Sequence, residues 1–176
     1  MSAIKFGPKK VVHSNPFMEI QHTEADFGTF KKDYFVVYFG PRAGIVAVRE
    51  GNVLLTRQYR FLIDTLSWEL PGGTIERGED PAEGAVRECF EETGVRCRDL
   101  KPLLVYYPGL DNVDNRTNLF FSESAELGGS FVRNNTEVLE IAWIPIAHCV
   151  EMVFRQEILD AMTVAGLLAY AWRTRR

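Results

Sequence analysis

The chain has 176 residues, of which 46% are hydrophobic and 25% are charged, with a formal net charge of −4 at pH 7. This composition is typical of a globular protein and excludes disordered and fibrous classes. The acidic balance argues against nucleic-acid and membrane partners, which require a basic surface. Three cysteines without metal-ligand spacing, and no apolar segment at the start, predict a cytoplasmic protein without a signal peptide or a membrane span.

The first part of the chain has the pattern of β structure. Phe17–Ile20 and Tyr34–Phe39 are rich in aromatic and branched residues, which favour strands. Ile45–Val48 and Val53–Leu55 flank Glu50-Gly51-Asn52, and this arrangement predicts a hairpin with a tight turn.

A helix is predicted after these strands. Asp80 suits the N-cap, Pro81 the first helical position and Gly94 the C-cap, while Glu83 completes an Asp-x-x-Glu capping box. Small and apolar residues recur at three- and four-residue spacing and predict one packing face, made of Ala82, Ala85, Val86, Cys89 and Thr93.

Three further strands are expected at Leu103–Tyr107, Asn118–Phe121 and Val138–Ile144, before a closing amphipathic helix from about Gln156 to Trp172. Several strands with a central and a closing helix predict a mixed α/β (α+β) fold, in which a mixed β-sheet is packed between helices.

Three glutamates, Glu88, Glu91 and Glu92, share one face of the central helix at positions i, i+3 and i+4. Like charges this close repel each other. A hard divalent cation such as Mg²⁺ relieves the repulsion, because it takes carboxylate oxygens and completes its coordination shell with substrate phosphates. Three glutamates alone are more often a solvated acidic helix face than a metal site.

The wider pattern favours the metal site. From Gly73 to Val95 the residues are GTIERGEDPAEGAVRECFEETGV, and this segment resembles the Nudix box. Cys89 departs from the aliphatic residue usual at its position, but a buried thiol behaves as a small hydrophobic group. The positions in register with the box are Gly73, Glu79, Arg87, Glu88, Glu91, Glu92 and Gly94.

Other segments resemble the ADP-ribose and nucleotide-sugar pyrophosphatase branch of that family: Gln58-Tyr59-Arg60, Leu70-Pro71-Gly72-Gly73, Tyr107-Pro108-Gly109 and Asp160-Ala161-Met162-Thr163. The resemblance implies Mg²⁺-dependent hydrolysis of the diphosphate bond of ADP-ribose or another nucleotide sugar, with Mn²⁺ as a possible substitute for Mg²⁺. It also implies a Nudix domain over residues 41–176 and an N-terminal antiparallel β extension over residues 1–40 that builds a homodimer.

The resemblance also implies the roles of individual residues. Glu88 and Glu92 are expected to be direct metal ligands, and Glu91 to be partly a ligand and partly a partner of Arg87. Glu88 and Glu91 are therefore also candidate catalytic residues. Gly72 is expected to offer its carbonyl group to a metal, and Glu79 to complete the cluster or to orient a metal-bound water.

Arg60 resembles a family arginine that contacts the substrate phosphates, which its planar guanidinium suits. Glu69 is a candidate substrate contact, with a structural carboxylate as the open alternative. The loop after the box departs from the branch pattern, which weakens the case for ADP-ribose over another nucleotide sugar. Its candidate substrate contacts are Pro108, Gly109, Asp111 and Arg116.

The resemblance to this branch implies that the general base is a glutamate on a loop between the box and the last strand. Glu123 and Glu126 have the pattern of hairpin surface charge. Glu137 follows a turn-rich stretch at the start of the strand and is the preferred base, with Glu140 inside the strand as the reserve.

Two other functions remain open at this point. One is a Nudix hydrolase acting on nucleoside triphosphates or dinucleoside polyphosphates, and the other is a non-catalytic nucleotide-sugar sensor. The missing basic patch argues against capped RNA, and the complete set of glutamates favours catalysis.

Overall fold

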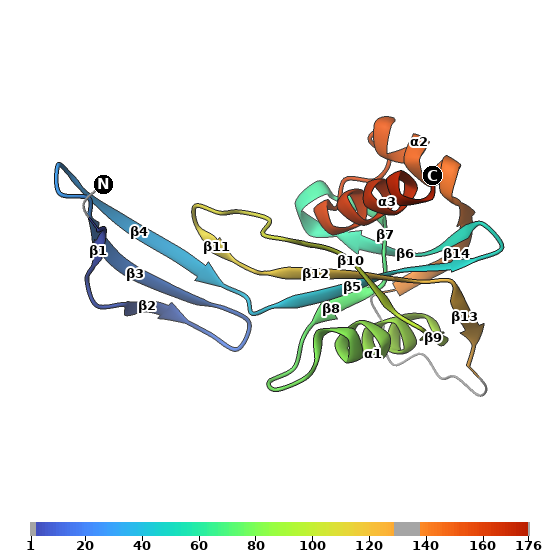
Figure 1. The fold of residues 1–176 in the computed structure, drawn as a ribbon, viewed down its shortest axis with the longest axis horizontal. Helices are drawn as coiled ribbons and strands as arrows, with labels where there is room; N and C mark the ends of the chain where they lie inside the picture. The colour runs from blue at the N-terminus through green and yellow to red at the C-terminus, as the bar shows by residue number, and fades with distance from the viewer. Residues whose placement is uncertain (1–2, 129–137, 176) are drawn as a thin grey trace. The chain divides into compact units, whose positions relative to one another are not determined.

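The computed structural model describes residues 3–128 and 138–175. Figure 1 labels the elements, which form two compact units. The smaller unit contains Met1–Pro41 and Tyr106–Arg116, and the larger unit contains Arg42–Val105 and Thr117–Arg176. The domain boundary expected at residue 40 remains a prediction, and the smaller unit also takes in the later segment Tyr106–Arg116.

The smaller unit is a five-stranded sheet in which β3 pairs antiparallel with β4, from Glu19↔Tyr38 to Asp26↔Lys31. β1 and β2 pair with β3, and β11 runs parallel to β4. Among the described residues of this unit, Ala25 is the one fully buried hydrophobic side chain. The strands are β1 (Lys5–Phe6), β2 (Lys10–Ser14), β3 (Glu19–Asp26), β4 (Lys31–Tyr38) and β11 (Val113–Asp114).

The larger unit contains a seven-stranded mixed sheet in the order β10-β12-β5-β6-β14, with β7 on β6 and β8 on β5. β5 pairs parallel with β12 and antiparallel with β6 and β8. The strands are β5 (Arg42–Arg49), β6 (Asn52–Arg60), β7 (Thr65–Glu69), β8 (Gly72–Thr74), β10 (Lys101–Tyr106), β12 (Thr117–Ser122) and β14 (Val138–Pro145), with a separate pair, β9 (Val95–Arg98) and β13 (Ser124–Leu127).

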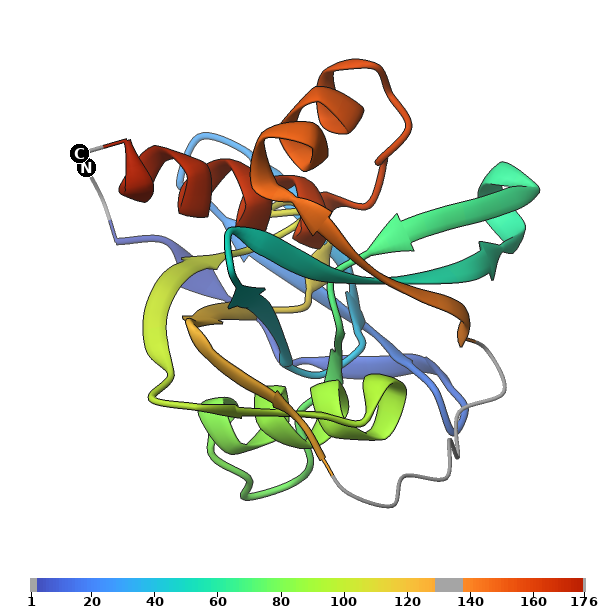
Figure 2. The same cartoon turned by 90° about the vertical axis from the view of Figure 1, so that its right-hand side faces the viewer.

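The central strand β5 is buried from Ala43 to Val48, because helices cover both faces of the sheet (Figure 2). On one face, Ile45 of β5 belongs to the same buried cluster as Ala85 of α1 (Pro81–Thr93). On the other face, Val46 belongs to a cluster with residues of α2 (Ile146–Phe154) and α3 (Ala161–Thr174). The predicted mixed sheet between helices is therefore confirmed.

The local signals around α1 and the first hairpin are confirmed. Asp80 accepts a hydrogen bond from the backbone N–H of Ala82 at 2.8 Å, and Gly94 ends the helix with φ 71°. Glu50 and Gly51 have φ values of 52° and 77°, as the tight turn of a two-residue hairpin requires.

The predicted closing helix from Gln156 is wrong in its start, and a second helix, α2, was not predicted. Gln156 has φ 61°, which lies in the left-handed region and interrupts a right-handed helix. The side chain of Asp160 accepts hydrogen bonds from the backbone N–H of Thr163 at 2.8 Å and from its hydroxyl at 2.7 Å. Asp160 is therefore the N-cap, and α3 begins at Ala161. Within residues 3–128 and 138–175, we find no helix whose length and hydrophobicity suit a membrane span.

Candidate active site

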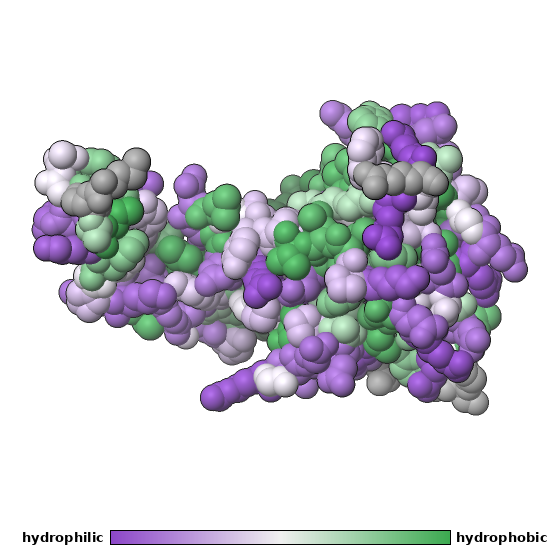
Figure 3. All heavy atoms as spheres, in the orientation of Figure 1, coloured by the Kyte–Doolittle hydropathy of each residue, from purple (hydrophilic) through white to green (hydrophobic). Residues whose placement is uncertain are grey.

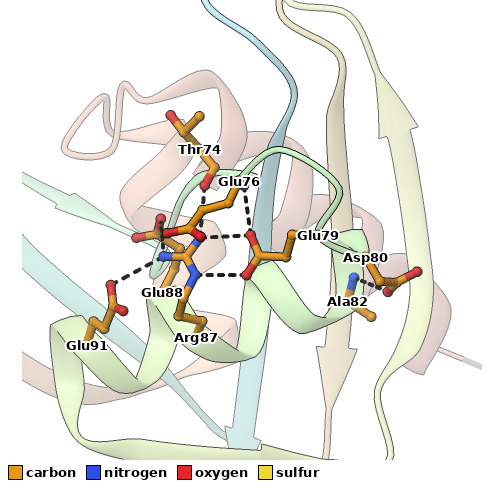
Figure 4. A network of polar contacts seen from close by, with 8 residues as sticks. All are labelled: Thr74, Glu76, Glu79, Asp80, Ala82, Arg87, Glu88 and Glu91. Atoms are coloured by element: carbon orange, nitrogen blue, oxygen red, sulfur yellow. Dashed lines mark hydrogen bonds and ion pairs between the residues drawn. The ribbon is translucent and has the colours of Figure 1, made fainter. Parts of the chain in front are cut away.

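Arg87 of α1 holds three glutamates together (Figure 4). Its Nε and Nη2 donate to the two carboxylate oxygens of Glu79 at 2.8 and 3.0 Å. Its Nη1 donates to Glu88 at 3.0 Å and to Glu91 at 3.3 Å. Nη2 also donates to the carbonyl oxygen of Thr74 at 3.0 Å, which ties the helix to β8. One guanidinium thus gathers carboxylates from the loop before the helix and from the helix itself.

The ion pair between Arg87 and Glu79 is strong because it is bidentate. The hydrogen bonds from Arg87, and one from the backbone N–H of Glu76 at 2.8 Å, lower the pKa of Glu79 to about 2. The carboxylates of Glu79 and Glu88 in turn raise the pKa of Arg87. Glu79 is therefore ionised at any pH near neutrality, and both of its oxygens are bound to the arginine.

Glu92 differs from these residues because it is buried, with 6% of its surface exposed. Burial raises the pKa of Glu92 to about 8, and the negative charges of Glu88 and Glu69 act in the same direction. The backbone N–H of Gly72 donates to its Oε2 at 3.3 Å. Burial also raises the pKa of Glu88, although the hydrogen bond from Arg87 opposes this shift. These two carboxylates are costly to ionise unless a cation lies beside them.

Two consecutive glycines allow β8 to approach the helix closely. A Cβ atom on Gly73 would lie 2.4–2.5 Å from the carboxylate atoms of Glu88, and a Cβ atom on Gly72 would lie 2.5 Å from the carbonyl oxygen of Ala43. Only glycine fits such distances without a shift of its neighbours. Gly73 therefore allows the carboxylate of Glu88 to lie against β8, whereas Gly72 allows β8 to lie against β5.

The carboxylates suit a hard divalent cation in their chemistry, since Mg²⁺ prefers oxygen ligands. Over residues 3–128 and 138–175, no three Asp, Glu, His or Cys side chains converge on a single point as metal ligands do. The hydrogen bonds account for this arrangement: Arg87 binds Glu79, Glu88 and Glu91, whereas Glu92 binds the backbone of Gly72.

A second ion pair joins the ends of β6 and β7. Arg60 Nε donates to Glu69 Oε1 at 2.7 Å, and Arg60 Nη2 donates to Glu69 Oε2 at 2.5 Å. Glu69 is 4% exposed, whereas 42% of the Arg60 side chain is exposed. The pair contributes to a cavity of about 370 Å³, whose other lining residues are Phe61, Leu62, Ile63, Ser67, Leu159 and Asp160.

The predicted site residues are divided between the two units. The glutamates of the box, Gly72, Arg60 and Glu69 all belong to the larger unit. Glu140 is 53% exposed in its side chain and pairs with Arg57 at 3.2 Å. Glu137 lies outside the described residues. The predicted contacts of the later loop belong to the smaller unit and are Pro108, Gly109, Asp111 and Arg116.

Sequence reasoning missed two features of the site. Arg87 was expected to pair with Glu91, but it also binds Glu79 and Glu88. Adjacent residues on a helix do not face each other, so their spacing carries no signal for the contact with Glu88. The approach of Glu79 depends on the path of the preceding loop. The contact between Gly73 and Glu88 was also missed, since nothing in the spacing of these residues shows it.

Comparison with known proteins supports the same family. A family model described as "NUDIX domain" matches residues 16–161. A CMP-5'-(N-acetyl-N-hydroxy-3-aminopropyl)phosphonate hydrolase of Streptomyces rubellomurinus is 33% identical over 165 residues, which cover 92% of this chain and 79% of that protein. An ADP-ribose pyrophosphatase of Bacillus subtilis is 26% identical over 149 residues, which cover 84% of this chain and 80% of that protein.

A solved structure, described as an ADP compounds hydrolase, is similar in fold. It superimposes with a TM-score of 0.86 and 18% sequence identity, and the match covers 99% of this chain and 96% of that chain. At this low identity the likeness bears on the fold and leaves the substrate open.

The Gly73→Ala variant is expected to weaken metal binding without unfolding the protein. The added Cβ displaces the end of the flexible Glu88 side chain, which the fold tolerates but a metal ligand set does not. We expect affinity for Mn²⁺, measured by electron paramagnetic resonance, to fall roughly 10- to 100-fold, the usual effect of a misplaced ligand.

Gly7→Ala is the matched control, because a Cβ atom at Gly7 meets its nearest neighbour, the carbonyl oxygen of Glu24, at an ordinary 3.5 Å. Parent-like Mn²⁺ affinity in Gly73→Ala would mean that Glu88 is not a ligand.

Proposed function

This chain belongs to the Nudix family, and we propose that it is a Mg²⁺-dependent hydrolase that cleaves the diphosphate bond between a nucleotide and a second moiety. The substrate is ADP-ribose or another nucleotide sugar, and the products are a nucleoside monophosphate and a sugar phosphate. Mn²⁺ replaces Mg²⁺. Hydrolases of this family generally use divalent metal ions, which agrees with a reaction at the glutamates of α1.

The observation that carries the proposal is the buried carboxylate of Glu92 close to Glu88. A carboxylate with a pKa of about 8 binds a proton at neutral pH, unless a cation makes its charged form favourable. Glu88 and Glu92 are the residues that would hold Mg²⁺, with Gly72 beside them. Glu91 and Glu79 complete the acidic cluster around Arg87.

If Glu88 and Glu92 hold Mg²⁺, the ion would supply positive charge to the diphosphate and lower the pKa of a bound water. Arg87 keeps Glu79, Glu88 and Glu91 together and limits their repulsion. Arg60 offers a planar guanidinium to a phosphate group. Glu137 accepts the proton of the attacking water, as the general base of the reaction.

The substrate class has support from the relatives. The protein from S. rubellomurinus is named for a CMP-linked phosphonate, and the protein from B. subtilis is named for ADP-ribose. Both names describe a nucleotide joined to a second group, which favours a substrate of this type over a nucleoside triphosphate. The greater identity to the phosphonate hydrolase makes a CMP-linked phosphonate the second candidate substrate.

A substrate panel with Mg²⁺, analysed by product mass, tests the function. It contains ADP-ribose, UDP-glucose, a CMP-linked phosphonate, dATP and diadenosine tetraphosphate. We expect a nucleoside monophosphate from one of the first three, and no turnover in the presence of a chelator. Glu88→Gln and Glu92→Gln each remove a hard ligand while keeping the shape of the side chain. Each variant should lose activity at least about 100-fold with an unchanged circular-dichroism spectrum.

Glu151→Gln is the control for these variants, because Glu151 is an exposed carboxylate that pairs with Arg155 on α2. Release of pyrophosphate from dATP as the main reaction would indicate a triphosphate hydrolase. Tight binding of a nucleotide sugar without turnover would indicate a sensor.

The general base is tested by comparing two variants. Glu137→Gln is expected to lower kcat roughly 10²- to 10⁴-fold, the usual contribution of a positioned base, with KM little changed. Glu140→Gln serves as the comparison, because Glu140 is engaged with Arg57. A collapse of kcat in Glu140→Gln, with Glu137→Gln close to the parent, would exchange the two roles.

We also propose that residues 1–40 build a homodimer. Large hydrophobic side chains of the smaller unit are exposed, and Figure 3 shows hydrophobic residues at the molecular surface among hydrophilic ones. A sheet that leaves such residues in water favours pairing with a second copy. Within residues 1–40 the most exposed of them are Phe6, Val11, Val12, Phe17, Phe30 and Phe35.

Multi-angle light scattering at micromolar concentration is expected to give twice the chain mass of 20.0 kDa. Phe17→Ser with Phe35→Ser should shift the protein to the monomer, because both side chains are more than half exposed in the single chain. A parent protein that scatters as a monomer would contradict the proposal.

We also propose that the protein works in the reducing cytoplasm, because its three cysteines, all within the described residues, are not joined in disulfides. Cys89, Cys97 and Cys149 are all buried free thiols in the structure. Disulfides are rare in the cytosol, and buried thiols in this state agree with that compartment.

A further inference from the structure

We infer that Glu69 is a positioning residue: a buried carboxylate that fixes the guanidinium plane of Arg60 for a substrate phosphate. The inference rests on the proposed function for the role of Arg60. On this inference Glu69 orients Arg60 and does not itself contact the substrate.

The register of the hairpin shows that the pairing of Arg60 with Glu69 is a specific arrangement. In the antiparallel pair of β6 and β7, Arg60 lies opposite Thr65 and Gln58 lies opposite Ser67. Glu69 lies opposite Thr56, which is two pairs further along the same face. The Arg60 side chain must therefore extend back along the hairpin, past Ser67, to reach Glu69. The small side chain of Ser67 leaves room for this path.

The geometry of the pair fixes the plane of the guanidinium. Arg60 Nε and Nη2 donate to separate oxygens of Glu69 at 2.7 and 2.5 Å, which is the two-bond fork of an arginine and a carboxylate. Gln58 Nε2 approaches Oε2 of the same carboxylate at 3.4 Å. Both oxygens of Glu69 are thus engaged by protein groups.

Burial separates the roles of the two partners. Glu69 is 4% exposed, whereas 42% of the Arg60 side chain is exposed at the cavity of about 370 Å³. Both side chains line the cavity, but Arg60 is the more exposed of the two and is the group that an entering anion can reach. Phe61, Leu62 and Leu159 contribute apolar side chains to the rest of the lining, and these side chains are themselves exposed.

The pair also lies close to the glutamates of α1. The charges of both Glu69 and Arg60 act on the carboxylate of Glu92. Glu92 in turn accepts the hydrogen bond from Gly72, three residues after Glu69 in the chain. Arg60 is therefore held within electrostatic reach of the residues that would bind the cation, where a diphosphate needs a positive group of fixed orientation.

A double-mutant cycle tests the inference, with Arg60→Lys, Glu69→Gln and both together. Glutamine keeps the shape of Glu69 but presents one donor nitrogen to the guanidinium, so the two-bond fork is lost. Kinetics use the best substrate with Mg²⁺, and calorimetry measures ADP binding with Mg²⁺ without the need for turnover. We expect Glu69→Gln to raise KM and the Kd for ADP roughly tenfold, with kcat within about threefold of the parent. The double variant should be no worse than Arg60→Lys alone, because the two residues act as one unit.

Additive effects in the cycle would overturn the inference. So would a Glu69→Gln variant that unfolds at a lower temperature but keeps the parent KM and Kd, since that is the behaviour of a purely structural carboxylate. Glu151→Gln is the matched control for loss of a glutamate charge from an ion pair with arginine, and it should change none of these values.

A second variant covers the case in which Glu69→Gln does not fold. Glu69→Asp keeps the charge and withdraws the carboxylate by one methylene group, and we expect the same rise in KM and Kd. A parent that binds ADP but hydrolyses no compound in the panel defeats the proposed function and leaves the calorimetric cycle to decide the role of Glu69. A parent that hydrolyses its substrate with an additive cycle defeats the inference alone. A parent that neither binds ADP nor hydrolyses any compound in the panel overturns the inference as well.

Discussion

Repulsion between carboxylates is the constraint on which the arrangement of the larger unit depends. Glu79, Glu88 and Glu91 are kept together because a single guanidinium binds all three. Glu69 is neutralised by its own arginine on the neighbouring hairpin. Glu92 has the backbone N–H of Gly72 as its hydrogen-bond donor, and its pKa rises to about 8 as a result of burial. Without a cation Glu92 therefore favours its protonated form at neutral pH, and a cation beside it would favour the charged carboxylate.

The fold supplies the rigidity that such a cluster needs. β5 is buried on both faces between α1 and the two closing helices, so the strands next to the site cannot shift without disturbing two cores. Close packing against glycine backbone then limits the positions of individual side chains. At Gly73 an added Cβ would enter the carboxylate of Glu88, and at Gly44 it would lie 2.7 Å from the sulfur of Met162.

The smaller unit is built on a different balance of forces. Its strands are well paired, with eight residue pairs between β3 and β4, but Ala25 alone of its described residues is a fully buried hydrophobic side chain. Backbone pairing without a core gives limited stability in water. In the proposed homodimer a second chain would cover the exposed aromatic residues of this unit. Burial of their apolar surface would then supply the stability that the missing core does not provide.

The sequence by itself determined the features that depend on a few neighbouring residues. The caps of α1 at Asp80 and Gly94, the turn at Glu50-Gly51 and the acidic face of the helix follow from local spacing, and the spacing of the box also indicated the family. The hydrogen bonds of a helix cap and the dihedral angles of a hairpin turn involve only a few neighbouring residues. Their signals therefore lie in adjacent positions of the sequence.

Only the tertiary structure decided the partners of the charged side chains. The fork between Arg60 and Glu69 depends on the register of β6 with β7, and the binding of Glu79 by Arg87 depends on the path of the loop before α1. The burial that raises the pKa of Glu92 depends on strands far from it in the sequence. The start of the closing helix was predicted too early because Gln156 has a positive φ, which its residue type does not indicate. Charge, burial and backbone strain at these positions are properties of the packed molecule, and residue spacing alone does not contain them.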